Sequence, residues 1–184
     1  AAMFGACGAA RIDADVLARE AVEPCRPAYH AVVARFGPGI VRPDGTLDRR
    51  ALGAIVFRDA DARRELEALI HPHVTDAIRR QLAEWRQSPS PPAVVVVEIP
   101  LLFEAGLEHL VDTVIVVSSE QGTQLQRLTS RTCLSPEEAM LRVAAQMPLG
   151  EKEARAHYVI RTDESLEATR DAVARVWGEI VSQA

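Results

Sequence analysis

Two short runs of β-branched residues constrain the fold most strongly. Residues 94–97 (VVVV) and 114–117 (VIVV) are continuously apolar, which suits strands covered by helices on both faces better than strands with one wet face. Residues 9–13 and 157–160 indicate two further short strands, and helical patterns separate all four. This alternation predicts a single α/β domain with an open parallel sheet flanked by helices.

Helix boundaries are marked by local signals. Gly8 stops a helix that is already under way at residue 1, and Asp48 caps a helix that runs to about Phe57. Ser135, Pro136 and Glu138 form the pattern of a capping box. Further helices are expected at residues 16–22, 26–37 and 120–130 and from Leu166 to the C-terminus.

An apolar stripe predicts a further helical face turned to the core. Leu66, Ile70, Val74 and Ile78 recur every four residues. Because proline removes an amide donor, Pro72 is expected to divide this segment into one helix ending near Ile70 and another beginning at Pro72. The sequence SPSPP at 88–92 predicts a surface linker.

Charge and cysteine content exclude several classes of protein. The net charge of −5 gives no long-range attraction to nucleic acid. Lys152 is the only lysine, and Cys7, Cys25 and Cys133 have no metal-ligand or disulfide pattern. We therefore expect a reducing cytoplasm. The longest apolar run is too short to span a bilayer, so no membrane association is expected.

In open α/β sheets the ligand lies beyond the carboxyl ends of the strands. The residues that follow the predicted strands are 13–15, 98–104, 118–121 and 161–164. These four segments are expected to contain the functional site.

Asp13 and Asp15 straddle the first strand-to-helix turn, so only one carboxylate is expected to face the site. Asp15 would accept a proton from an attacking hydroxyl or orient it. The alternative is a helix N-cap with an Asp15–Arg19 pair one turn apart, and spacing alone favours this alternative.

Three arginines flank the separately capped helix at 135. Arg127, Arg131 and Arg142 would suit a flap that brings positive charge over a transferring phosphate. Solvated surface charge is the ordinary alternative for each of them.

Metal signals are weak. His71 and His73 lie two residues apart with no nearby third ligand, so a role at a helix boundary is favoured. Glu98 follows a strand and could reach Mg²⁺ through water. For Glu104 a helix-turn salt bridge is equally consistent with the sequence. No residue is assigned as a direct metal ligand, and neither G-x-x-x-x-G-K-[ST] nor G-x-G-x-x-G occurs.

Together, a series of short motifs resembles the dephospho-coenzyme A kinase family. In chain order they are 12–19 (IDADVLAR), 47–52 (LDRRAL), 69–72 (LIHP), 99–104 (IPLLFE), 134–138 (LSPEE), 142–146 (RVAAQ) and 158–160 (YVI). Each motif is short, but their order and spacing cover nearly the whole chain.

The resemblance implies a P-loop kinase fold and transfer of the ATP γ-phosphoryl group to the ribose 3′-hydroxyl of dephospho-coenzyme A, with Mg²⁺ accompanying ATP. It places Asp15 beside the accepting hydroxyl, against the cap favoured by spacing. Residues 19–92 would form a helical coenzyme A-side subdomain and residues 131–150 a lid. The implied site comprises Asp15 and Arg142 (catalytic), Arg131 and Arg142 (ATP), and Asp13, Asp15, Arg19, His71 and Glu104 (substrate).

Three features depart from the family pattern. Cys25 stands where glycine is usual, and residues 161–163 (RTD) replace a turn that usually contains asparagine. The first strand and the phosphate-binding loop of the family are not found, which is expected to leave two strand edges unpaired and the chain inactive alone. A non-catalytic scaffold that binds coenzyme A precursors and a kinase for another nucleoside or nucleotide stay open as alternatives.

Overall fold

The structure is a computed structural model that describes residues 1–132 and 135–183. Cys133, one of the three cysteines, and Leu134, the first residue of the motif at 134–138, lie outside the described residues. Both belong to the predicted lid. The chain divides into two compact units. One comprises residues 11–99 and the other residues 1–10 and 100–184.

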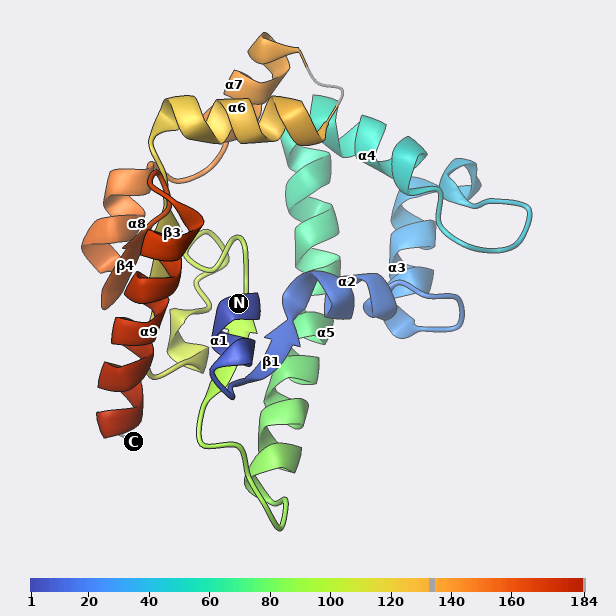
Figure 1. The fold of residues 1–184 in the computed structure, drawn as a ribbon. Helices are drawn as coiled ribbons and strands as arrows, with labels where there is room; N and C mark the ends of the chain where they lie inside the picture. The colour runs from blue at the N-terminus through green and yellow to red at the C-terminus, as the bar shows by residue number, and fades with distance from the viewer. Residues whose placement is uncertain (133–134, 184) are drawn as a thin grey trace. The chain divides into compact units, whose positions relative to one another are not determined.

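The unit of residues 11–99 is mainly helical. A long helix, α5, is contacted by three shorter ones, and two short strands pair with each other (Figure 1). The elements are β1 (Ala10–Asp13), α2 (Ala14–Ala21), α3 (Pro27–Phe36), a 3₁₀ turn at Pro38–Ile40, α4 (Arg49–Arg58), α5 (Ala60–Arg86) and β2 (Val95–Glu98). The helices predicted from residue 26 and after Asp48 are confirmed as α3 and α4.

Two apolar clusters stabilise this unit. In the first, Ile12 and Ala14 pack with Val74 and Ile78 of α5. The second contains the buried residues Val22, Ala28, Val32, Ile40, Leu47 and Leu52. Because α5 contributes Ile70 to both clusters, it is the common support of the surrounding helices.

The expected division at Pro72 is wrong, because α5 continues through Pro72 without a break. Pro72 is exposed, so the backbone carbonyl that it leaves without an amide donor is close to water. Ile70 and Val74, on either side of it, both contact the core. Tertiary packing of the apolar stripe therefore outweighs the local cost of proline.

Cys25 adopts a positive φ of 70°, which explains why glycine is usual at this position. A side chain in the left-handed region costs about 1–2 kcal/mol. We expect Cys25→Gly to raise the free energy of unfolding by about 0.5–1 kcal/mol, because glycine also loses more entropy on folding. Urea denaturation will measure it. Cys25→Ala is the matched control, and an equal gain in that variant would contradict the backbone explanation.

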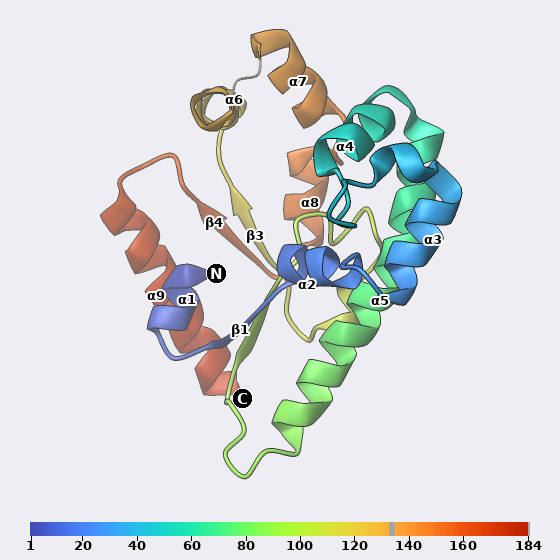
Figure 2. The same cartoon turned by 90° about the vertical axis from the view of Figure 1, so that its right-hand side faces the viewer.

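The unit of residues 1–10 and 100–184 is built around two parallel strands. Ile115 pairs with Tyr158 and Ser118 with Arg161. The elements are α1 (Ala2–Ala6), a 3₁₀ turn at Glu108–Leu110, β3 (Ile115–Ser118), α6 (Gln121–Arg131), α7 (Pro136–Ala144), α8 (Leu149–Arg155), β4 (Tyr158–Arg161) and α9 (Leu166–Gln183). Helix α9 packs on β4 and on α1 (Figure 2), with the Phe4 and Trp177 rings 6.5 Å apart.

The predicted strands are confirmed to within one or two residues, and β3 and β4 are parallel as expected. The strands of the described residues form two pairs, β1–β2 and β3–β4, in place of one continuous sheet.

Helix α8 was not predicted. No helix among residues 1–132 and 135–183 is long and apolar enough to cross a membrane.

Candidate functional site

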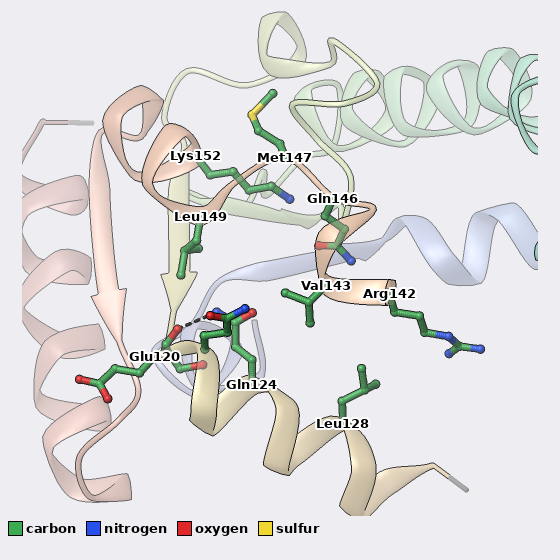
Figure 3. A pocket seen from close by; sticks show the side chains of 11 residues that line it. Glu120, Gln124, Leu128, Arg142, Val143, Gln146, Met147, Leu149 and Lys152 are labelled. Carbon is green, nitrogen blue, oxygen red and sulfur yellow. Dashed lines mark hydrogen bonds between the residues drawn. The ribbon is translucent and has the colours of Figure 1, made fainter. Parts of the chain in front are cut away.

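A pocket of about 620 Å³ opens beside the carboxyl end of β3, within the unit of residues 1–10 and 100–184 (Figure 3). This volume lies in the range of small-molecule sites. The lining residues come from the end of β3, from α6 and from the segment between α7 and α8: Ser119, Glu120, Gln121, Gln124, Leu128, Arg142, Val143, Gln146, Met147, Leu149 and Lys152. Residues 118–121 were expected at the site because they follow a strand, and Ser119, Glu120 and Gln121 of this segment line the pocket.

Hydrogen bonds join the carboxyl ends of β3 and β4. The Glu120 amide donates to Asp163 Oδ1 at 2.8 Å, and Arg127 donates to Thr162 Oγ1 at 2.8 Å. The Thr162 hydroxyl in turn donates to the Ser118 carbonyl at 3.1 Å. These bonds fix the start of α6, which supplies one wall of the pocket.

Helix α7 carries Arg142 in its last turn. The predicted capping box is confirmed: Ser135 accepts from the Glu138 amide, and the Glu138 carboxylate accepts from the Ser135 amide. Such a box stabilises the helix start by reciprocal bonds. Arg142 and Val143 therefore reach the pocket from a locally stabilised helix.

Helix α8 is tied to the preceding loop by an ion pair at the pocket. Lys152 Nζ lies 2.7 Å from Glu104 Oε1, and their side chains are only 12% and 23% exposed. The same carboxylate oxygen accepts from the Met147 amide at 3.0 Å. Glu104 thus forms a salt bridge with a residue distant in sequence, and not the helix-turn pair that was expected.

A second ion pair extends this attachment. Arg155, one turn after Lys152, pairs with Glu108, and its guanidinium lies 4.7 Å from the centre of the buried Phe103 ring. Two cations on one face of α8 thus hold the loop of residues 100–110.

These contacts lower the pKa of the Glu104 carboxyl group. Partial burial raises its pKa, but the hydrogen bonds from Lys152 and the Met147 amide lower it more, so the pKa lies below the ordinary 4.5. A carboxyl with a depressed folded-state pKa contributes stability above its unfolded pKa, and this contribution disappears as the pH falls through the folded value.

We therefore expect Glu104→Gln to lower the free energy of unfolding by about 1 kcal/mol at pH 7, because it weakens charge-assisted hydrogen bonds. The difference from the unmodified protein should shrink as the pH falls below 4.5 and through the lower folded-state pKa. Urea denaturation at a series of pH values from 7 downward measures it. Glu179→Gln, a change on α9, is the control, and a difference that stays constant as the pH falls would contradict the ionic explanation.

The three predicted arginines have different surroundings. Arg142 lines the pocket. Arg131 is the last residue of α6 and is exposed, and it is not among the pocket-lining residues described. Arg127 is used to hold Thr162. Of the predicted phosphate-binding pair, the structure brings only Arg142 to the pocket.

The remaining predicted residues, except Glu104, lie in the unit of residues 11–99. Asp13 is the N-cap of α2, since its Oδ1 accepts from the Asp15 and Val16 amides at 2.9 and 3.2 Å. The N-cap interpretation of Asp15 is thus wrong, and Asp15 is exposed in the first turn of the helix. Arg19 lies in the last turn of α2, and His71 lies within α5, which contacts α2.

A magnesium ion that arrives with a nucleotide needs few protein ligands. The described residues contain no group of three or more His, Cys, Asp or Glu side chains able to hold a metal ion. Mg²⁺ is typically bound by one or two carboxylates together with substrate phosphates and water. Glu98 is the last residue of β2, and its Oε2 lies 3.6 Å from Arg11 Nη2, so its carboxylate is paired with a cation in the unit of residues 11–99.

Sequence reasoning missed part of the pocket. Lys152, Gln124 and Gln146 were not selected as site residues. Lys152 lies late in the chain and is not on a glycine-rich loop, so no motif marks it. Its distinguishing signal was composition: it is the one lysine among 21 basic residues.

The parallel strands β3 and β4, the helices beside them and a pocket with cationic side chains at the strand ends define an α/β protein suited to an anionic ligand. The sequence model for dephospho-CoA kinase matches residues 1–168. The chain is 48% identical to the dephospho-CoA kinase of Symbiobacterium thermophilum over 96% of its length and 73% of the relative, and 47% identical to that of Geobacter metallireducens over 96% and 87%.

Solved structures agree with these relatives. The fold matches a crystal structure from Thermus thermophilus with a TM-score of 0.77 and 35% identity, covering 97% of this chain and 88% of the other. It matches the dephospho-CoA kinase of Campylobacter jejuni with a TM-score of 0.70 and 27% identity, covering 98% and 89%. The chain belongs to the dephospho-CoA kinase family, and the family resemblance expected from its motifs is confirmed.

Proposed function

We propose that this protein transfers the γ-phosphoryl group of ATP to the ribose 3′-hydroxyl of dephospho-coenzyme A, giving coenzyme A and ADP in the last step of coenzyme A biosynthesis. The observation that carries the proposal is the family match over residues 1–168. The pocket beside β3, with Arg142 on its wall, supports it.

The reaction forms one bond and breaks one. The 3′-oxygen attacks the γ-phosphorus, the bond to the bridging β,γ-oxygen breaks, and the hydroxyl proton is accepted by Asp15. Positioning and charge neutralisation dominate phosphoryl transfer, so Arg142 and Arg131 are assigned to the ATP phosphates. Mg²⁺, when bound with ATP, neutralises further phosphate charge.

The acceptor substrate is assigned to the helical unit. Asp13, Asp15, Arg19 and His71 are proposed substrate contacts in this unit. Glu104, which lies in the other unit and pairs there with Lys152, is a further proposed contact. Residues 19–92, which include α3, α4 and α5, are the proposed coenzyme A-side subdomain, and residues 131–150 the proposed lid. We place the activity in the cytoplasm on the basis of the cysteine pattern.

Substrate profiling tests the proposal with the protein expressed from its complete gene. We expect ATP-dependent formation of coenzyme A from dephospho-coenzyme A, detected by mass spectrometry. Phosphorylation of a nucleoside or nucleoside monophosphate, and not of dephospho-coenzyme A, would support the alternative that the protein is a kinase for another nucleoside or nucleotide. The printed 184 residues contain no phosphate-binding loop motif, so we propose that alone they do not turn over ATP. Binding without turnover by the complete protein would favour the scaffold.

A further inference from the structure

Lys152 lines the pocket but has no part in the reaction as described above. Its side chain is 12% exposed, so its charge is largely withdrawn from bulk water. An ammonium group has three N–H donors, and Glu104 accepts one of them at 2.7 Å. A lysine that lines a pocket can offer its remaining donors to a ligand there.

Glu104 restricts where this ammonium can lie. Its Oε1 is held in turn by the Met147 amide, so the carboxylate is fixed from a second direction. A lysine chain otherwise has many rotamers, and ordering it in advance reduces the entropy lost when a ligand binds. The pair therefore presents an oriented donor at the pocket wall.

The charges around the pocket favour an anion. Lys152 and Arg142 are its cationic lining residues, and Glu120 is its acidic one. In Figure 3 the Glu120 carboxylate points away from Gln146 and Lys152, whereas the Lys152 chain extends toward Gln146. The lining of the pocket thus contains two cationic side chains and one carboxylate.

The identity of the residue also fits a compact anion contact. All other basic residues of this chain are arginines, 20 of the 21. A lysine ammonium is a compact point charge that suits a single phosphate oxygen, whereas guanidinium is larger and planar. Position 152 therefore holds the smaller cation in a largely enclosed place.

We propose that Lys152 binds a phosphate oxygen of the nucleotide in this pocket and that Glu104 is its positioning residue. This inference rests on the proposed function for the identity of the ligand. The pocket chemistry itself requires only a polyphosphate. Inorganic tripolyphosphate is therefore a suitable probe that does not depend on the acceptor substrate.

The first test uses the unmodified protein expressed from its complete gene. Lys152 is acetylated with acetic anhydride, and the extent at this residue is read by peptide mass spectrometry. ATP and tripolyphosphate at saturating concentration should each slow acetylation of Lys152 at least about fivefold, whereas adenosine should leave it unchanged. Absence of protection by both phosphates, or equal protection by adenosine, would overturn the proposal.

The second test compares variants by titration calorimetry. Lys152→Met should weaken ATP binding about 10-fold or more, the effect of losing one charged hydrogen bond, and should leave adenosine binding within about twofold. Arg175→Met removes an exposed arginine of α9 that does not line the pocket as described, and should leave both affinities unchanged. Equal weakening of ATP and adenosine by Lys152→Met would show a structural role only.

The outcomes separate this inference from the proposed function. A protein that makes coenzyme A without phosphate protection of Lys152 would keep the function and overturn the site. A protein that shows this protection but does not phosphorylate dephospho-coenzyme A would keep the site and overturn the function. If Lys152→Met does not fold, the acetylation test alone decides.

Discussion

Replacement of Asp15 by asparagine is expected to lower kcat for dephospho-coenzyme A phosphorylation by about 10²–10⁴-fold, the usual contribution of a general base. KM for either substrate should stay within about threefold, because the amide keeps the size of the side chain and loses only its ability to accept the proton. Steady-state kinetics of the protein expressed from its complete gene measure both constants.

The structure makes this substitution informative. Asp13, and not Asp15, caps α2, so Asp15→Asn leaves the capping bonds in place. Asp15 is exposed, and the loss of a negative charge near a helix N-terminus costs only about 0.3–1 kcal/mol. A large decrease in kcat would therefore report on chemistry and not on folding.

Glu20→Gln is the matched control for Asp15→Asn. It makes the same change from carboxylate to amide on an exposed residue near the other end of α2. We expect wild-type kcat from this variant. An unchanged kcat in Asp15→Asn would exclude Asp15 as the base, and a rise in KM alone would assign it to substrate binding.

The features predicted well from the sequence are those that depend on near neighbours. The N-cap of α4 at Asp48 and the capping box at Ser135 are satisfied within three residues along the chain. The β-branched runs predicted β2 and β3 because branched side chains favour extended backbone, although the expected burial on both faces is wrong for β3, where Val117 is 60% exposed. In each case the cause of the structure lies inside the segment itself.

The failures concern features that depend on distant residues. Pro72 was expected to end a helix, but core contacts on both sides of it keep α5 continuous. Helix α8 has seven residues and few apolar positions, so its periodicity is weak. It is stabilised by Glu104 and Glu108, which precede it by more than one element of structure.

The same reason explains why the site was only partly predicted. Arg142 could be proposed from its motif, and the structure brings it to the pocket. The salt bridge between Lys152 and Glu104 joins helix α8 to a loop that is remote in sequence. No local sequence pattern predicts this salt bridge. The family motif at residues 99–104 pointed to Glu104 alone and not to Lys152.

Replacement of Arg142 by alanine is the second change with a large expected effect. Its guanidinium is proposed to stabilise charge on the transferring phosphoryl group, and loss of one such donor typically lowers kcat by about 10²–10³-fold. Arg142→Lys should recover part of this loss, because it keeps the charge but not the bidentate geometry. Single-turnover kinetics with saturating ATP would separate the chemical step from binding.

Arg170→Ala on α9 is the control for Arg142→Ala, since Arg170 is an exposed arginine outside the lining residues of the pocket. It should retain the wild-type rate, and thermal unfolding of both variants will show whether either substitution disturbs the fold. A kcat within threefold of wild type in a folded Arg142→Ala variant would contradict the role in phosphoryl transfer. A loss confined to KM for ATP would mean that Arg142 binds the nucleotide equally in the ground and transition states.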